Sequence, residues 1–410
     1  MSVPLIRPNP PRLSQAADRL RAIEDSGIFS NFGPANTAFE QDMVARMFGG
    51  EGGCMTVCNA TIGLMLAVQQ AIGGRPTGTK YALMPSFTFA AAAHAAMWCG
   101  LTPLFCDIDP ATWTSCPEHE ERLIAHYGAD IAVVMPYATF GFDLDLSRYT
   151  ALTARHGIPV VVDAAASLGT VSADGRGYGA GFRGLIVYSM HATKSFATGE
   201  GGVIYSADPA AIATLRQMCN FGFGKPRNAT MPGLNAKLSE VGALLAHLRL
   251  GENDAMIEHR SALMQGYRDA LPELAFQTQR PGEQAHQFAP GLLPRALAPH
   301  RAEIMASLAR RGIGCATYFS PHVLQQDYFA GFTLGGALPV SDDVGARIIS
   351  LPLFDSMTAH DLVEVVTVLR EEMARFAKPA RSRARRPLKR APAPLVPVPS
   401  APHPTIGART

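Results

Sequence analysis

No apolar run in the 410-residue sequence reaches the roughly 18 residues that a membrane-spanning helix needs. The first residues, MSVPLIRPNPPRL, also lack the apolar core of a secretory signal, so we expect a cytoplasmic protein without a membrane span. The seven cysteines include no CxxC pair, and no His-x-His spacing accompanies them. Buried free thiols are therefore favoured over disulfides or a metal site.

Acidic residues are missing from one end of the chain. From Lys378 onward the sequence has eight basic residues and no acidic one, which leaves 28 basic against 34 acidic residues in the rest. Proline and alanine are abundant in the same segment, so we predict that residues 379–410 form a disordered basic tail. Contact of the tail with nucleic acid or an anionic membrane surface stays open. A solubilising extension is favoured, and no nucleic-acid partner is expected.

One stretch, Arg183 to Ser206, has the pattern of two strands joined by a turn. Apolar runs at 185–190 and 203–205 flank a polar turn that contains Lys194. A lysine amine that is shielded from water has a lowered pKa and can form a Schiff base with an aldehyde cofactor. When the turn is taken alone, a solvated surface charge is the simpler interpretation of this lysine.

A second stretch favours the Schiff-base interpretation. The run IPVVVD, residues 158–163, is typical of a buried parallel strand and ends in Asp163. A buried carboxylate needs a cationic or donor partner, because leaving it unpaired costs several kcal/mol. The pyridinium nitrogen of pyridoxal phosphate is such a partner.

With this aspartate about thirty residues before the lysine of an S-x-H-x-T-K segment, the chain resembles the DegT/StrS-type nucleotide-sugar aminotransferases. The likeness includes SGIFSNFGP at 26–34, GLNAKLSE at 233–240 and LPL at 351–353, and it extends over roughly residues 10–375. It implies a pyridoxal-phosphate enzyme with the aspartate aminotransferase-like fold, which is also termed fold type I.

Alternating strands and helices independently predict an α/β fold with a mainly parallel sheet and a ligand at the carboxyl ends of its strands. Strands are predicted at 81–84, 104–107, 131–135 and 158–163, and helices at 11–25, 37–47, 117–126 and 146–156. We expect a large cofactor-binding domain over residues 1–249 and a smaller α/β C-terminal domain over residues 250–378, followed by the tail.

The resemblance implies further roles at the cofactor. Ala60, Thr61 and Ser189 would bind the cofactor phosphate, the first two from the start of a helix. A helix capped by Asn59 explains that start equally well without a ligand. The resemblance also implies that the face of Phe89 lies against the pyridine ring, whereas its sequence alone suggests a core residue.

The resemblance further implies a homodimer with shared active sites, in which Asn235 and Lys237 reach the cofactor and substrate of the partner subunit. Tyr318 and His322 resemble the family's aromatic-proline segment beside the sugar site, although packing is the favoured interpretation of His322. One position departs from the family pattern. The third residue after the aspartate is usually Gln or His and contacts the cofactor, but here it is Ala166.

These features predict an aminotransferase that moves an amino group to a nucleotide-linked keto-deoxy sugar, for amino-sugar, polysaccharide or glycoside biosynthesis. Glutamate is the donor that the resemblance implies. A sugar dehydratase of the same family and a non-catalytic regulatory member are the alternatives. Relatives that dehydrate the sugar replace the cofactor lysine by histidine, so Lys194 favours the aminotransferase.

Overall fold

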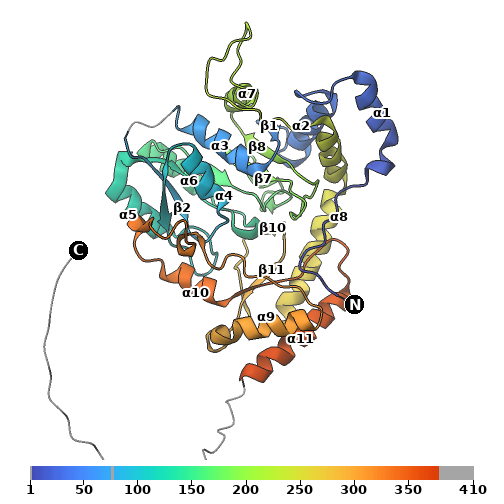
Figure 1. The fold of residues 1–410 in the computed structure, drawn as a ribbon, viewed down its shortest axis with the longest axis vertical. Helices are drawn as coiled ribbons and strands as arrows, with labels where there is room; N and C mark the ends of the chain where they lie inside the picture. The colour runs from blue at the N-terminus through green and yellow to red at the C-terminus, as the bar shows by residue number, and fades with distance from the viewer. Residues whose placement is uncertain (1, 75–77, 378–410) are drawn as a thin grey trace, which may run out of the picture. The chain divides into compact units, whose positions relative to one another are not determined.

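The computed structural model describes residues 2–74 and 78–377, and the tail predicted at 379–410 lies outside these residues. Figure 1 shows a large sheet with helices on both faces, and the long helix α8, which runs down beside that sheet to a smaller one. No helix in the described part of the chain is long and apolar enough to cross a membrane.

Parallel strands form most of the large sheet, as predicted. Its members are β1 (Gly53–Val57), β2 (Tyr81–Pro85), β3 (Thr102–Cys106), β4 (Ile131–Val134), β5 (Val161–Asp163), β7 (Leu185–Ser189) and β8 (Gly202–Ser206). Bridges between Val134 and Val160 and between Tyr137 and Asp163 place β4 beside β5, which gives the order β3-β2-β4-β5-β7-β8-β1. Strand β8 runs antiparallel to both of its neighbours. The predicted α/β fold with a mainly parallel sheet is confirmed.

Helices cover both faces of this sheet, which explains why its strands are continuous apolar runs. One face packs against α3 (Ala60–Ala71), α4 (Ala91–Trp98) and α7 (Pro209–Met218). The other face packs against α2 (Pro34–Met47), α5 (Pro117–Tyr127), α6 (Leu146–His156) and the first part of α8 (Glu240–Ala270). Helix α1 (Ala17–Ser26) lies outside this layer against α8 and ends at Gly27, whose φ of 65° is left-handed. Strand β1 was not predicted, because its sequence, GCMTV, has neither an alternation of apolar and polar residues nor a long apolar run.

The remaining elements form a smaller antiparallel sheet and its helices. The sheet has the order β12 (Ile348–Leu351), β11 (Ala289–Leu292) and β9 (Ala275–Phe276), and it shares a core with α9 (Arg301–Arg310) and α11 (Ala359–Ala377). Helix α10 (Pro339–Arg347) precedes β12, and a short ribbon pairs β6 (Val171–Ser172) with β10 (Gly282–Glu283). This ribbon joins a loop of the large sheet to the segment that leads into the smaller one.

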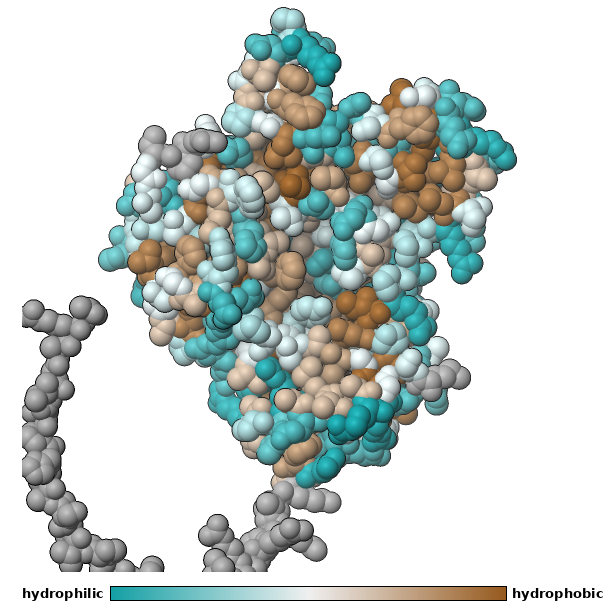
Figure 2. Space-filling model, in the orientation of Figure 1, coloured by the Kyte–Doolittle hydropathy of each residue, from teal (hydrophilic) through white to brown (hydrophobic). Residues whose placement is uncertain are grey.

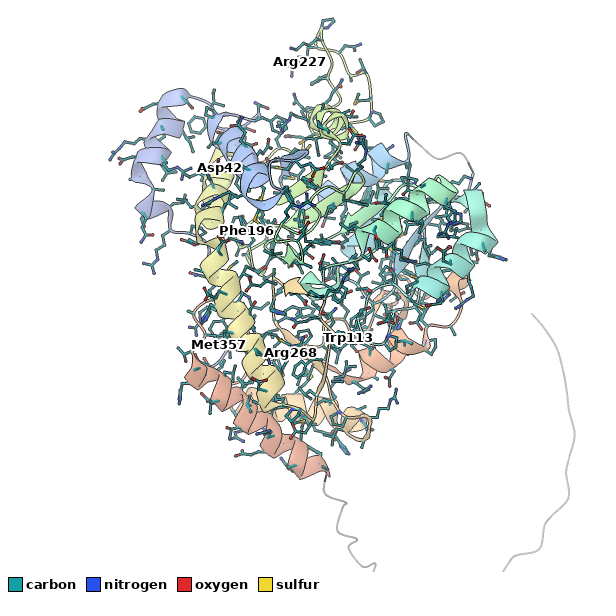
Figure 3. The ribbon with its side chains drawn as sticks, turned by 180° about the vertical axis from the view of Figure 1, so that it is seen from behind. Asp42, Trp113, Phe196, Arg227, Arg268 and Met357 are labelled. Atoms are coloured by element: carbon teal, nitrogen blue, oxygen red, sulfur yellow. The ribbon has the colours of Figure 1, made fainter. Side chains whose placement is uncertain are left out.

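Helix α8 connects the two sheets without a break. It begins after Ser239, whose hydroxyl accepts a hydrogen bond from Gly242 N, and it continues through residue 250, where the domain boundary is expected. Figure 3 shows Phe196, from the large sheet's side, and Met357, from the smaller sheet's side, along the same helix. The division into two domains stays a prediction, and any boundary at 249/250 would fall inside a regular helix.

Continuity of α8 at this boundary has a measurable consequence. Gly251 lies on the exposed side of the helix, where an added Cβ would meet nothing within 4 Å. Gly251→Ala should therefore raise the free energy of unfolding by about 0.5–1 kcal/mol, because alanine loses less conformational freedom in a helix.

Gly157 is the matched control, because its Cβ would also meet open space but its φ is +68°. Gly157→Ala should lower the free energy of unfolding by about 1 kcal/mol in the same urea titrations. A loss of stability in Gly251→Ala as large as in Gly157→Ala would show that α8 is broken at residue 251.

Candidate active site

Four strand ends meet at one edge of the large sheet. Asp163 ends β5 and pairs with Val187 in β7, while Ser189 at the end of β7 pairs with Gly202 at the start of β8. Gly202 in turn pairs with Val57, after which the chain enters α3. The register therefore brings the predicted carboxylate, the predicted serine and the start of α3 to the same edge.

The turn between β7 and β8 carries Lys194 and is tied together by its own backbone. Lys194 N donates to His191 O at 2.9 Å, and the His191 ring bonds the Thr193 hydroxyl at 2.8 Å. Met190 N donates to Gly201 O at 2.9 Å, which closes the base of the turn. Gly201 has a φ of 157°, and a Cβ there would lie 2.7 Å from the Met190 side chain. These contacts fix the backbone from which the lysine extends, and His191 shapes the turn.

Burial and charge act in opposite directions on the pKa of Lys194. Burial disfavours the ammonium form and lowers the pKa, while the negative charge of Asp163 raises it, and burial is the larger effect. A lowered pKa increases the fraction of neutral amine, which is the form that attacks an aldehyde. The side chain is partly buried, and its Nζ donates to Gln287 Oε1 at 3.3 Å.

Asp163 is a buried acid whose pKa is raised. Only 2% of its surface is exposed, and burial raises its pKa to about 6, against the lowering effects of the Ala165 amide and of Lys194. The Ala165 N–H donates to Asp163 Oδ1 at 3.1 Å. Tyr137 lies close enough for the Asp163 charge to raise its pKa, in addition to the larger effect of burial. The carboxylate would gain stability from a further positive charge at this edge.

The start of α3 lies across Gly202 from Ser189. Asn59 caps the helix, because its side chain accepts from Ile62 N at 2.9 Å, so the predicted cap is confirmed. Ala60 and Thr61 occupy the first turn, where the amide groups have no carbonyl of their own helix to bond. A Cβ on Gly202 would lie 3.0 Å from Ala60 N, so glycine permits the close approach of β8 to this helix.

The arrangement fits pyridoxal phosphate by its donor set. The amine of Lys194, with its lowered pKa, could react with the aldehyde, and the buried carboxyl of Asp163 could pair with a protonated ring nitrogen. The amides at the start of α3 and the Ser189 hydroxyl could bond a phosphate. Ser189 is buried, and its hydroxyl accepts from His191 N at 3.2 Å. Among the described residues, no group of three or more His, Cys, Asp or Glu side chains could hold a metal ion.

The aromatic residues predicted at the site lie near the same edge. Phe89 follows β2 and is 59% exposed, with its ring centroid 6.3 Å from that of Phe319. Tyr318 stacks on Phe288 at 4.9 Å. Phe89 is open to solvent, and its contact with the cofactor stays a prediction, as does the contact of Tyr318 with substrate.

His322 is held by protein groups on both sides of its ring. Nδ1 bonds the Ser86 hydroxyl at 2.7 Å and Nε2 bonds Asp342 Oδ1 at 3.0 Å, and the residue is 1% exposed. The order Ser-His-Asp resembles that of a hydrolase triad. Ser86, however, is completely buried and its hydroxyl also accepts from Leu324 N, so it is not open to a substrate. The contacts favour the packing interpretation of His322.

The segment with Asn235 and Lys237 runs beside the start of α3. The carbonyl of Ala236, between them, accepts from Cys58 N at 2.7 Å. Asn235 is exposed, whereas Lys237 Nζ donates to Asn220 Oδ1 at 3.1 Å and lies 4.9 Å from the centre of the Phe221 ring. Their role in a partner subunit stays a prediction.

Sequence reasoning missed Gln287. Its amide bonds Lys194 and also donates from Nε2 to Thr193 O at 3.0 Å. No local pattern marks this glutamine, which lies 93 residues beyond the lysine. The buried Ala166 confirms only that a methyl group fills the position where the family usually has a polar side chain.

The chain is similar to a known family of aminotransferases. The model of the DegT/DnrJ/EryC1/StrS aminotransferase family matches residues 13–370. Protein Rv3402c of Mycobacterium tuberculosis (strain ATCC 25618 / H37Rv) is 32% identical over 378 residues, which cover 91% of this chain and 90% of the relative.

Solved structures extend the match to three dimensions. A protein of Bacillus cereus ATCC 10987, assigned as a PLP-dependent aminotransferase, is 36% identical with a TM-score of 0.84, over 90% of this chain and all of the other. DesI, solved in the presence of its TDP-sugar product, is 30% identical with a TM-score of 0.81, over 91% of this chain and 93% of the other. The expected fold type I is confirmed. The chain belongs to the DegT/DnrJ/EryC1/StrS aminotransferase family.

Proposed function

We propose that this pyridoxal-phosphate-dependent aminotransferase moves an amino group from an amino acid, glutamate above all, to a nucleotide-linked keto-deoxy sugar. The observation that supports it most is the amine of Lys194, with its lowered pKa, within the electrostatic reach of the buried Asp163. The family and the B. cereus protein support the cofactor, and DesI with its TDP-sugar product supports a nucleotide-linked sugar.

Each residue at the sheet edge has a role in this proposal. Bound here, pyridoxal phosphate supplies an aldehyde that links to amines and a ring that withdraws electrons. Lys194 Nζ holds the cofactor covalently, and as a free amine it takes and returns the proton that moves during amino transfer. Asp163 keeps a positive charge on the ring nitrogen. Ala60, Thr61 and Ser189 orient the phosphate.

The presence of the lysine supports transfer rather than dehydration. A dehydratase of this family would have histidine in place of Lys194. The sugar and the donor can be identified by mass spectrometry of the products formed from a panel of nucleotide-linked keto sugars with glutamate. Absence of aminated sugar from every member, in a protein that binds the cofactor on Lys194, would favour a regulatory role.

The covalent site itself is testable. Lys194→Ala should abolish the covalent link to pyridoxal phosphate, because no other lysine lies in the turn between β7 and β8. Borohydride reduction followed by peptide mapping measures the link. Lys80→Ala is the control, because Lys80 is paired with Asp130 far from this edge, and it should keep the full link. Cofactor reduced onto another lysine would refute the assignment.

We predict that Asp163 lowers the stability of the cofactor-free protein near neutral pH, although it is needed for activity. Its pKa is about 6 in the fold and 3.8 for an unperturbed aspartate, so its contribution to stability is present below pH 4 and is lost as the pH rises through 6. The loss amounts to about 3 kcal/mol. In the cofactor-free protein at pH 7.5, Asp163→Asn should therefore unfold at higher urea concentration than wild type, and the difference should shrink at pH 4.

The same variant should bind pyridoxal phosphate but lose transamination by roughly two orders of magnitude or more, because a neutral amide stabilises a protonated ring nitrogen poorly. Near-normal turnover in Asp163→Asn would make this aspartate a structural residue only.

We also propose that two chains share their active sites. Exposed apolar side chains support an interface, namely Ile28, Phe29 and Phe221, and Figure 2 shows apolar atoms gathered near α1. Asn235 and Lys237 lie in the segment that packs beside the start of α3, next to Phe221. In a two-fold dimer each chain would give this segment to its partner and receive the same one.

Mixing inactive chains tests this arrangement. Lys194→Ala chains mixed with chains altered at both Asn235 and Lys237 should recover about a quarter of wild-type activity, because random exchange makes about half the dimers mixed and each mixed dimer has one intact site. Exchange is followed with differently tagged chains. Mixed dimers that form and remain inactive would show that these residues serve their own chain.

A further inference from the structure

The amine of Lys194 is held by a side chain from a distant part of the sequence. Gln287 precedes β11 of the smaller sheet and is 6% exposed. Its Oε1 accepts from Lys194 Nζ at 3.3 Å, and its Nε2 donates to Thr193 O at 3.0 Å. One amide thus bonds both the reactive nitrogen and the backbone immediately before it.

The backbone on both sides of this contact is fixed by one buried ion cluster. From α8, Arg249 donates to Ser195 O at 2.9 Å, directly after the lysine. Arg260 donates to the carbonyls of His286 and Gln287 at 2.8 and 3.3 Å. Both guanidinium groups also bond Asp355, at 2.5 and 2.6 Å. The two halves of the lysine–glutamine contact are therefore anchored to the same carboxylate.

Charge also stabilises this anchor. Burial opposes ionisation of Asp355, but the charges and hydrogen bonds of the two arginines outweigh burial and hold its pKa below the usual value. Breaking a buried pair of this kind leaves an uncompensated buried charge, so the cluster is a rigid support. A side chain built on such a support can hold a flexible lysine in one place.

The contact is one that a free lysine amine makes. Lys194 Nζ donates and Gln287 Oε1 accepts, and an unlinked amine always has hydrogens for this bond. An amide keeps its neutral charge throughout the working pH range, so it can orient the amine without fixing it as a permanent ammonium ion. A carboxylate at the same place would favour the charged form.

We propose that Gln287 is a positioning residue, which holds the free amine of Lys194 at the sheet edge whenever the lysine is not linked to the cofactor. The proposal rests on the proposed function and extends it to a residue outside the strand-turn-strand stretch. Held in this way, the amine stays ready to link to the aldehyde and to take or return a proton.

Other titratable or charged groups around the lysine do not duplicate this role. They are Asp163 at the end of β5, His191 and Glu200 in the turn, Arg249 and Arg260 on α8, and His286 beside the glutamine. His286 is neutral, because burial, with the two nearby arginines Arg268 and Arg260, lowers its pKa to about 3. Asp163 acts on the amine by charge, whereas Gln287 bonds it directly.

The test follows the rate at which cofactor-free protein forms its covalent link with pyridoxal phosphate, from absorbance, as a function of pH. Gln287→Met should lower the plateau rate at high pH roughly tenfold, because the neutral amine is no longer held in place. It should also move the midpoint of the pH profile down by about one unit, because the ammonium form loses an acceptor. Gln287→Glu should move the midpoint up by a similar amount.

Gln277→Met is the matched control. Gln277 is also a buried glutamine, 3% exposed, but its amide nitrogen donates to the Thr112 and Thr139 carbonyls and not to the turn of the lysine. It should lose stability as Gln287→Met does, while its plateau rate and midpoint stay at the wild-type values. Urea titrations of all variants show whether each one is folded under the assay conditions.

The outcomes separate the two proposals. Wild-type protein that forms no link on Lys194 would refute the proposed function. Wild-type protein that links normally, with an unchanged plateau and midpoint in Gln287→Met, would refute the positioning role alone. Equal changes in Gln287→Met and Gln277→Met would also refute it, because general loosening would then explain the effect. If Gln287→Met does not fold, the test rests on Gln287→Glu. An unshifted midpoint of its pH profile for link formation would overturn the proposal.

Discussion

The site depends on a carboxylate that is buried at the end of a parallel strand. Asp163 is 2% exposed, and burial raises its pKa to about 6, so the fold keeps this group at a cost to its own stability. Such a cost is tolerated where a positively charged ligand offsets it. The lysine opposite is affected in the reverse sense, because the same burial lowers its pKa. Burial at one sheet edge therefore raises the pKa of the acid and lowers the pKa of the amine.

Strand register brings the rest of the site to this edge. Asp163 and Ser189 end two different strands and the start of α3 follows a third, yet the position of each results from the pairing of one strand with the next. The antiparallel strand β8 is essential to this arrangement, because it lets a short turn return from the end of β7 to the same edge. Lys194 lies in that turn, so the lysine and the serine are placed by one hairpin.

The sequence predicted the parts of this site that depend on local patterns. Asp163 ends an apolar run, Asn59 precedes an apolar helix, and Lys194 lies between two strands, so each could be located from the sequence alone. Gln287 could not, because its contact with the lysine depends on how α8 places a second sheet against the first. The domain boundary expected at 249/250 stays a prediction, and no local pattern reveals that the helix continues through it. Long-range packing, unlike periodicity, leaves no local mark in a single sequence.

The continuity of α8 constrains how the two sheets can move. Arg249 bonds the turn of the lysine, Arg260 bonds the segment of the glutamine, and Asp355 bonds both arginines. A hinge near residue 250 would separate these two arginines and break at least one buried ion pair, at a cost of about 3–5 kcal/mol. Rigid association of the smaller sheet with the lysine is therefore favoured over hinged closure. Adjustment to different sugars would then fall to exposed groups at the rim, such as Phe89, whose ring is not fixed by this cluster.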